Sequence, residues 1–196
     1  MPYTNYNWIR DGLAIGGLVS EPEELPFDAI LSMETGAPIV LRELVTSGRI
    51  DYQWRSIIDG YCWEEHDEII RRFDEAADQL HEWLTGGKRV LVHCVAGVSR
   101  SVTAVVWYLM RYEGMSWDEA LQLIRAARPQ ANPNIRFEIP MRMAGGEDIT
   151  RDWIANRIEE YCRHLETIYD VEMDRQEVWK DLERQGTLGR IGVALS

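Results

Sequence analysis

A cysteine and an arginine are placed where both could act on a phosphate ester. Cys94 and Arg100 are separated by five residues, and a valine-rich run precedes the cysteine. That run predicts a buried strand, and the apolar residues after Arg100 predict a helix, so the segment between them is a strand-to-helix loop. Backbone N–H groups of such a loop can point inward and surround a tetrahedral oxyanion. Gly97 gives the backbone the freedom to curl in this way.

These residue types suit nucleophilic substitution at phosphorus. The positive end of the following helix stabilises a thiolate, so we expect Cys94 to be a nucleophile at neutral pH. The guanidinium of Arg100 can donate two parallel hydrogen bonds to phosphate oxygens and stays charged throughout turnover. A cysteine after a valine-rich strand is more often a small buried hydrophobe. The glycine and arginine that follow it at these spacings favour catalysis over that simpler interpretation.

A proton donor is also needed, because expelling an alkoxide or phenoxide without one is slower by about 10²- to 10⁴-fold. Asp59 follows residues 50–58, whose alternation predicts a strand, and should lie at the same sheet edge as Cys94. Gly60 would let the acid loop move. Asp67 is the alternative donor, although its position at the start of a helix is adequately explained by a carboxylate near the positive end of the helix dipole. We therefore expect Asp59 to be the acid.

Strands and helices alternate around these residues. The expected strands are a hairpin over residues 8–18 around Asp11-Gly12, then 29–33, 50–58 and 89–93. The expected helices are 38–46, 67–84, 101–112 and one capped by Ser116. This order predicts an α/β fold with a mostly parallel central sheet flanked by helices, and it places the site beyond the carboxyl ends of the strands.

The residues from His93 to Ser101, His-Cys-Val-Ala-Gly-Val-Ser-Arg-Ser, resemble the signature of the dual-specificity protein phosphatases, within the Cys-x5-Arg cysteine-dependent tyrosine phosphatases. Residues 12–16, 116–120 and 132–137 resemble flanking parts of that family, so the resemblance covers roughly residues 8–143. One departure is Glu138-Ile139-Pro140, where many relatives have a glutamine in a helix. Pro140 is expected to limit helix formation there.

The resemblance implies a role for each residue of the loop. Cys94 would attack phosphorus and form a phosphocysteine, and Arg100 would hold the phosphate oxygens. His93 would help to keep the thiolate ionised, and Ser101 would assist breakdown of the phosphocysteine. The phosphate would be bound by the segment Val95, Ala96, Gly97, Val98, Ser99 and Arg100. No cofactor and no metal are expected.

The expected substrate class depends on the absence of basic residues between Cys94 and Arg100. Phosphoinositide head groups usually need Lys or Arg inside the loop, whereas Val95, Ala96 and Val98 stand there. The chain also lacks length for the extra loops of larger tyrosine-specific relatives. We expect a protein phosphatase acting on phosphotyrosine, with phosphoserine and phosphothreonine as further candidates. The alternatives are a phosphoinositide or phosphoglucan phosphatase, a phosphate-binding pseudoenzyme and a rhodanese-like sulfur carrier.

The composition of the chain limits the kinds of partner and the location that we expect for it. The 196 residues carry 21 Lys and Arg against 33 Asp and Glu, a net charge of −12, so nucleic acid and anionic membranes are not expected as partners. No apolar run approaches the roughly 20 residues that span a bilayer. The first residues lack the features of a secretory signal, which predicts a cytoplasmic location. The three cysteines show no CxxC spacing and predict neither a disulfide framework nor a zinc site.

Some residues have both a functional and an ordinary interpretation. His66, His81 and His164 carry no ligand spacing and are predicted to be solvated helix positions. Cys62 could form a disulfide with Cys94 on oxidation, although incidental placement explains it as well. A further pair, Trp54 and Trp63, could either line a substrate wall or belong to the core.

Residues 147–196 lie beyond the resemblance. Apolar residues between Trp153 and Tyr169 recur at three and four positions, which predicts an amphipathic helix, and the series from Val171 to Leu182 predicts another helical segment. We therefore expect a catalytic domain over residues 1–146 and a helical extension over 147–196. The extension would either complete the catalytic core or form a surface for a homodimer or partner.

Overall fold

The computed structural model describes residues 5–18, 25–34, 41–59, 66–184 and 186–190. Five strands form one sheet: β1 (Tyr6–Arg10), β2 (Leu13–Gly16), β3 (Ala29–Ser32), β4 (Asp51–Trp54) and β5 (Val90–His93). Their order is β1-β2-β5-β3-β4, with β1 antiparallel to β2 and the other pairs parallel. The mostly parallel α/β sheet predicted from the sequence is confirmed.

The strands follow their sequence patterns, with one exception. The hairpin turns at Asp11-Gly12, where Gly12 has a φ of 79° that favours glycine. Every residue of β2, β3 and β5 is buried, because helices cover both faces of the sheet. The exception is β4, which ends at Trp54 rather than at Ile58. It lies at the edge of the sheet, where one side of the strand lacks a neighbour to extend the ladder.

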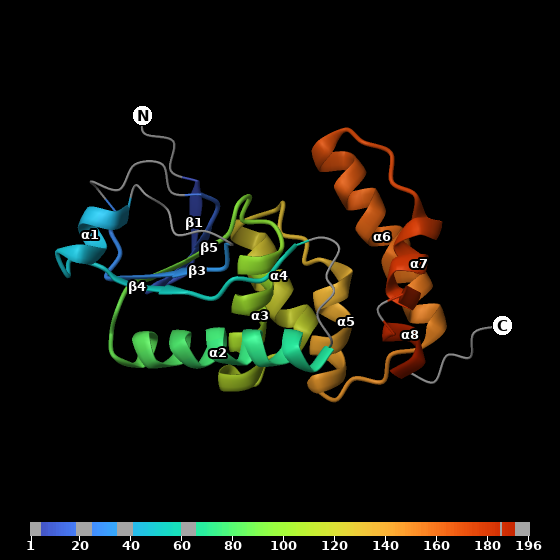
Figure 1. The fold of residues 1–196 in the computed structure, drawn as a ribbon, viewed down its shortest axis with the longest axis horizontal. Helices are drawn as coiled ribbons and strands as arrows, with labels where there is room; N and C mark the ends of the chain where they lie inside the picture. The colour runs from blue at the N-terminus through green and yellow to red at the C-terminus, as the bar shows by residue number, and fades with distance from the viewer. Residues whose placement is uncertain (1–4, 19–24, 35–40, 60–65, 185, 191–196) are drawn as a thin grey trace.

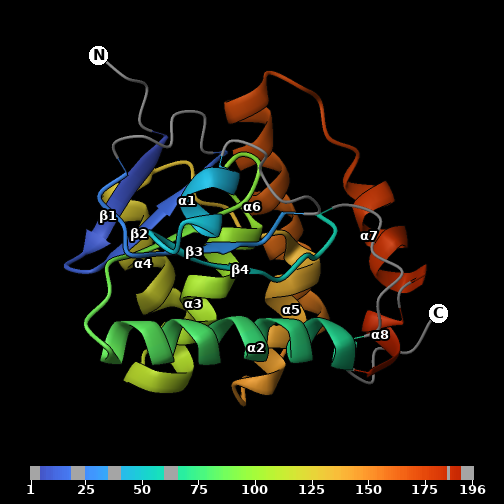
Figure 2. The same cartoon turned by 60° about the vertical axis from the view of Figure 1, so that its left-hand side comes forward.

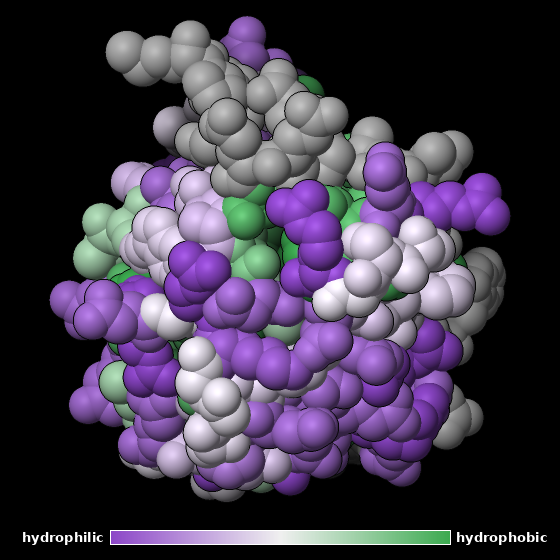
Figure 3. Space-filling model, turned by 90° about the vertical axis from the view of Figure 1, so that its left-hand side faces the viewer, coloured by the Kyte–Doolittle hydropathy of each residue, from purple (hydrophilic) through white to green (hydrophobic). Residues whose placement is uncertain are grey.

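Helices cover the two faces of the sheet unequally (Figures 1 and 2). One face carries α2 (His66–Thr85), α3 (Arg100–Glu113) and α4 (Trp117–Ala127), which with β2, β3 and β5 enclose the main hydrophobic core. The opposite face is covered by the short helix α1 (Arg42–Thr46). Residues 38–40, which the sequence assigns to this helix, lie outside the described residues. The molecular surface toward α1 is largely hydrophilic (Figure 3).

Two sequence-based predictions about helices had different outcomes. The capping box predicted at Ser116 is present, since its hydroxyl accepts from the Glu119 N–H while the Glu119 carboxylate accepts from the Ser116 N–H. The prediction that Pro140 limits a helix is wrong, because α5 (Ile135–Ala144) passes through it. All residues from Ile135 to Arg142 are buried, so packing on both sides offsets a proline cost of about 3 kcal/mol.

The C-terminal part forms a further helical layer. Its helices are α6 (Arg151–Tyr169), α7 (Arg175–Arg184) and α8 (Thr187–Arg190). They enclose a second hydrophobic cluster with α5, to which Ile135 and Ile139 contribute from α5 and Ile154, Ile158 and Leu182 from the later helices. The layer lies on the side of α5 away from the sheet (Figure 1). Among the described helices, none is long and apolar enough to cross a membrane.

Candidate active site

The loop between β5 and α3 is arranged around the sulfur of Cys94. The side chain is only 2% exposed and lies where β5 ends. The Gly97 N–H donates to Sγ at 3.3 Å, and the Ser101 hydroxyl lies 3.4 Å from the same sulfur. Both are donors to a thiolate, and α3 begins at Arg100, directly after the loop. The structure therefore brings Cys94, Gly97 and Ser101 together as the sequence predicts.

The loop keeps its shape because Gly97 and Arg128 fit together behind it. Gly97 has a φ of 68°, and a Cβ at this position would come within 2.6 Å of the Gly16 carbonyl oxygen. The guanidinium of Arg128, which is 2% exposed, donates to the Gly97 carbonyl and, at 2.9 Å, to the Ala96 carbonyl. Sequence reasoning missed Arg128, because a basic residue at the C-terminal end of α4 is usually explained by the helix dipole.

Arg100 is held by groups from the segments that follow β3 and β4. It is buried and donates from Nη1 to the carbonyls of Ile57, at 3.2 Å, and Met33, at 3.4 Å. Its Nη2 lies 3.2 Å from a carboxylate oxygen of Glu34, just beyond the end of β3. These contacts fix the plane of the guanidinium at the rim of the loop, with Nε toward Asp59 at 3.5 Å. Glu34 was not anticipated from the sequence.

Asp59 lies at the site, as predicted. Its Oδ1 accepts from the Asn134 side-chain amide at 3.0 Å, and its Oδ2 faces Arg100. The same Asn134 donates its backbone N–H to the Ser99 hydroxyl at 3.1 Å, so one residue ties the carboxylate to the loop. The competing Asp67 lies in the first turn of α2 and does not line the cavity over Cys94.

His93 is fully buried beside Cys94. Its Nδ1 lies 3.4 Å from the Cys94 carbonyl oxygen, and because a carbonyl only accepts, Nδ1 carries the proton. Burial lowers the pKa of His93, so the neutral ring is favoured at neutral pH. The ring therefore acts on the loop as a hydrogen-bond donor rather than as a cation.

A cavity of about 120 Å³ opens above the loop. The loop residues Cys94 to Arg100, apart from Gly97, line its floor. Asp59 and Asn132 line its sides. Its remaining wall is made by Tyr161, Leu165 and Tyr169 of α6, which the sequence analysis did not connect with the site. The residues that line the cavity can thus bind a phosphate group and offer a carboxylate and a thiol to it.

Comparison with known proteins identifies the family. The family model "Dual specificity phosphatase, catalytic domain" matches residues 18–144, which is more than half of the chain. This chain belongs to the dual specificity phosphatase family. It is 46% identical over 70 residues to human dual specificity protein phosphatase 22, covering 36% of this chain and 38% of the relative. It is 41% identical over 88 residues to the Xenopus tropicalis protein of the same name, covering 44% and 42%.

A solved structure extends the likeness beyond these segments. The crystal structure of DUSP15 superposes with a TM-score of 0.59 at 26% identity and covers 84% of this chain and 96% of that one. The chain spans only about two fifths of the length of the curated relatives named above. The residues matched to the dual specificity phosphatase model end at 144, before α6 begins.

Other predicted positions differ from expectation. His66 is buried and its Nε2 lies 2.9 Å from the Thr187 hydroxyl, so the prediction of a solvated position is wrong. His81 stacks on Tyr112 and is half-buried, as is His164. Both α2 histidines are covered by neighbours that lie far from them in the sequence. Of the residues that the structure describes, no three His, Cys, Asp or Glu are grouped to hold a metal ion.

The structure describes only part of the segment around Asp59. Cys62, Trp63 and Gly60 lie outside the described residues, so their predicted roles stay predictions. Trp54 is described, is 46% exposed and is not among the residues that line the cavity. It is therefore neither a core residue nor part of the cavity wall.

Proposed function

We propose that the chain is a cysteine-dependent protein phosphatase that hydrolyses phosphotyrosine, and also phosphoserine or phosphothreonine, through a phosphocysteine on Cys94. The single observation that carries this is the buried sulfur, which faces donors from Gly97 and Ser101 at the floor of a cavity that also holds Arg100 and Asp59. Membership of the dual specificity phosphatase family supports the same activity.

In the proposed mechanism, the thiolate of Cys94 attacks phosphorus and the ester oxygen leaves with a proton from Asp59. The loop N–H groups and Arg100 bind the phosphate oxygens throughout. Asp59, now a carboxylate, takes a proton from the water that attacks the phosphocysteine, and phosphate leaves. The Ser101 hydroxyl, 3.4 Å from Sγ, donates to the sulfur as it regains its negative charge.

The test replaces the nucleophile and keeps the anion site. Cys94→Ser should abolish hydrolysis of an aryl phosphate while retaining binding of vanadate or phosphate, because the loop and Arg100 remain. Arg100→Lys should lose both activity and binding substantially, since an ammonium cannot reproduce the two parallel hydrogen bonds. Steady-state kinetics and calorimetry measure the two properties. Near-normal turnover by Cys94→Ser would refute the mechanism.

A protein or peptide ester is proposed as the substrate class in preference to the other esters. Val95, Ala96 and Val98 place no cation in the loop for the additional phosphates of a phosphoinositide. Release of phosphate from a panel of phosphopeptides, a phosphoinositide and a phosphoglucan tests this. Greater activity on either non-protein ester would contradict it.

The finer statements about partners and location stay predictions. These are a homodimer through residues 147–196, the division at residue 146, the exclusion of nucleic acid and membranes, and a cytoplasmic location. Light scattering on the purified chain tests the homodimer directly.

A further inference from the structure

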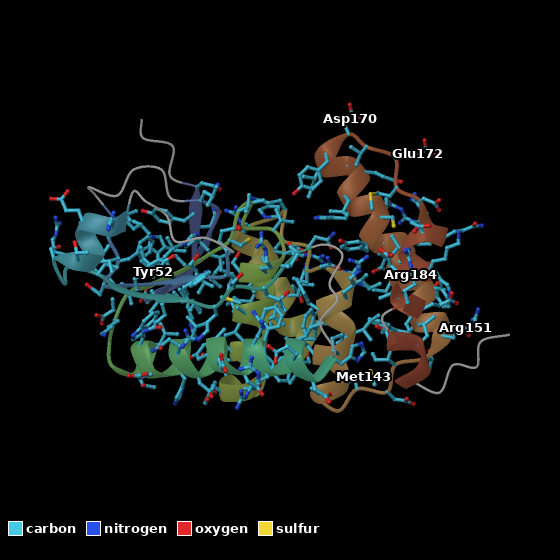
Figure 4. The ribbon with its side chains drawn as sticks, in the orientation of Figure 1. Tyr52, Met143, Arg151, Asp170, Glu172 and Arg184 are labelled. Carbon is cyan, nitrogen blue, oxygen red and sulfur yellow. The ribbon has the colours of Figure 1, made fainter. Side chains whose placement is uncertain are left out.

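Helix α6 forms one wall of the cavity over Cys94, although it lies outside the residues that match the family model. It contributes Tyr161, Leu165 and Tyr169 to the cavity lining, one face of the helix at spacings of four residues. In Figure 4, the labelled residues Arg151 and Asp170 mark the two ends of α6, and the end at Asp170 lies at the top of the view, above the strands of the sheet. Tyr169 immediately precedes Asp170 and is the last residue of the helix.

The wall formed by Tyr161, Leu165 and Tyr169 is apolar and aromatic, and Val95 adds an apolar side chain from the loop. Tyr169 is 49% exposed, and Val95 of the loop, which lines the same cavity, is 45% exposed. The electrostatic surroundings of the tyrosine agree with this position, because burial together with the charges of Asp59 and Cys94 raises the pKa of Tyr169. An aromatic ring entering between Tyr169 and Val95 would gain apolar contact on both of its faces.

The same helix also supports one side of the cavity, because Arg157 contacts Asn132. Its guanidinium donates to the Asn132 Oδ1 at 3.3 Å and is anchored on Glu138 at 2.7 Å. This contact turns the Asn132 amide so that Oδ1 faces the helix. The Nδ2 group of Asn132 is buried and has no hydrogen-bond partner among the described residues, in a side chain that lines the cavity. It can donate to an anionic substrate.

We propose that α6 is the specificity wall of the active site and that Leu165 and Tyr169 select phosphotyrosine over phosphoserine and phosphothreonine. This inference rests on the phosphatase activity proposed above. In phosphotyrosine, a benzene ring separates the phosphorus from the peptide backbone, so the phosphate reaches the buried sulfur while the backbone stays outside the wall. The shorter esters must bring their backbone down to the height of α6. The wall would therefore deepen the cavity, although the chain lacks the extra loops of larger tyrosine-specific relatives.

Tyr169 is the residue to change. Tyr161 also lines a second cavity, of about 310 Å³, and packs against the second hydrophobic cluster, so its replacement would disturb the fold. Tyr169 is half exposed at the end of its helix, which keeps the cost to folding small. Val171 is a matched control, because it is 47% exposed, lies two residues further on and does not line the cavity.

The experiment compares two peptides of one sequence that carry either phosphotyrosine or phosphothreonine. The wild-type chain should prefer phosphotyrosine in kcat/KM. Tyr169→Ala should reduce that preference by about fivefold, mainly by raising KM for the phosphotyrosine peptide, because the ring contact is made in the ground state and the transition state alike. Tyr169→Phe should keep the preference, and Val171→Ala should leave both peptides unaffected.

The outcomes separate this inference from the function on which it rests. Hydrolysis of both peptides with an unchanged ratio in Tyr169→Ala would overturn the wall and leave the phosphatase activity standing. A wild-type preference for phosphothreonine, or equal losses in Tyr169→Phe and Tyr169→Ala, would also overturn it. If the wild-type chain hydrolyses neither peptide, the proposed function fails, and the wall fails with it. Thermal melting of each variant checks that the fold is retained.

Discussion

Asp59 is positioned by two side chains from different parts of the chain. Asn134 donates to one carboxylate oxygen at 3.0 Å, and Arg100 faces the other at 3.5 Å. Neither contact follows from the residues next to Asp59, which the sequence analysis used. For single residues, the geometry of the site therefore depends on supporting side chains, with Arg128 behind the loop and Asn134 beside Asp59.

Asp59→Asn should lower turnover on a phosphotyrosine peptide by about 10²-fold or more, because the phenolate then leaves without a proton. The loss should be much smaller on an aryl phosphate whose leaving group is already a weak base. Comparing kcat on the two substrates measures this dependence. Asp67→Asn is the control and should behave as the wild type; a leaving-group dependence in that variant alone would move the acid to Asp67.

At the scale of elements, α5 joins the catalytic part of the chain to the later helices. The Glu138 side chain is completely buried and accepts from Arg142 at 3.0 Å and from Arg157 of α6 at 2.7 Å. Arg142 also reaches Asp118 of α4 and Glu147. The Glu138 carboxylate thus links α5 to α6 in addition to their shared hydrophobic cluster, and through Arg157 it supports Asn132 at the cavity.

Glu138→Gln should lower the free energy of unfolding by about 3 to 5 kcal/mol, because the buried Arg157 guanidinium loses its ion pair with Glu138, whereas Arg142 keeps Asp118 and Glu147. Denaturant unfolding followed by circular dichroism measures it. Glu75→Gln is a matched control in an exposed ion pair with Arg71 on α2, and it should cost less than about 1 kcal/mol. Equal effects of the two variants would show that burial does not strengthen the Glu138 contacts.

At the scale of the whole molecule, the helices after residue 146 share a hydrophobic cluster with α5. Ile135 and Ile139 of α5 are buried against Ile154, Ile158 and Leu182. His66 at the start of α2 contacts Thr187 of α8, so the last described helix also meets the helical layer next to the sheet. Removing residues 147–196 would expose this cluster and the Glu138 carboxylate.

A chain that ends at Gly146 should therefore be insoluble or melt several degrees lower than the full chain. Ile154→Ala in the full chain is a milder change to the same cluster. It should lower the free energy of unfolding by about 2 to 5 kcal/mol, because the side chain is completely buried. Differential scanning calorimetry and sedimentation measure both. A truncated chain that stays soluble and equally heat-resistant would show that these helices contribute little to the fold.

Residue patterns along the chain predicted most of the strands and helices, the capping box at Ser116 and the Cys94–Arg100 loop. These features depend on periodicity, turn residues and spacings within a few positions, so they follow from interactions between residues that are close in the sequence. Four features became visible only in the folded chain: α5 continues through Pro140, His66 is buried, Arg128 supports the loop and α6 lines the cavity. Each of these depends on burial against residues distant in the chain, and a pattern of neighbouring residues carries no information about which distant surface will cover it.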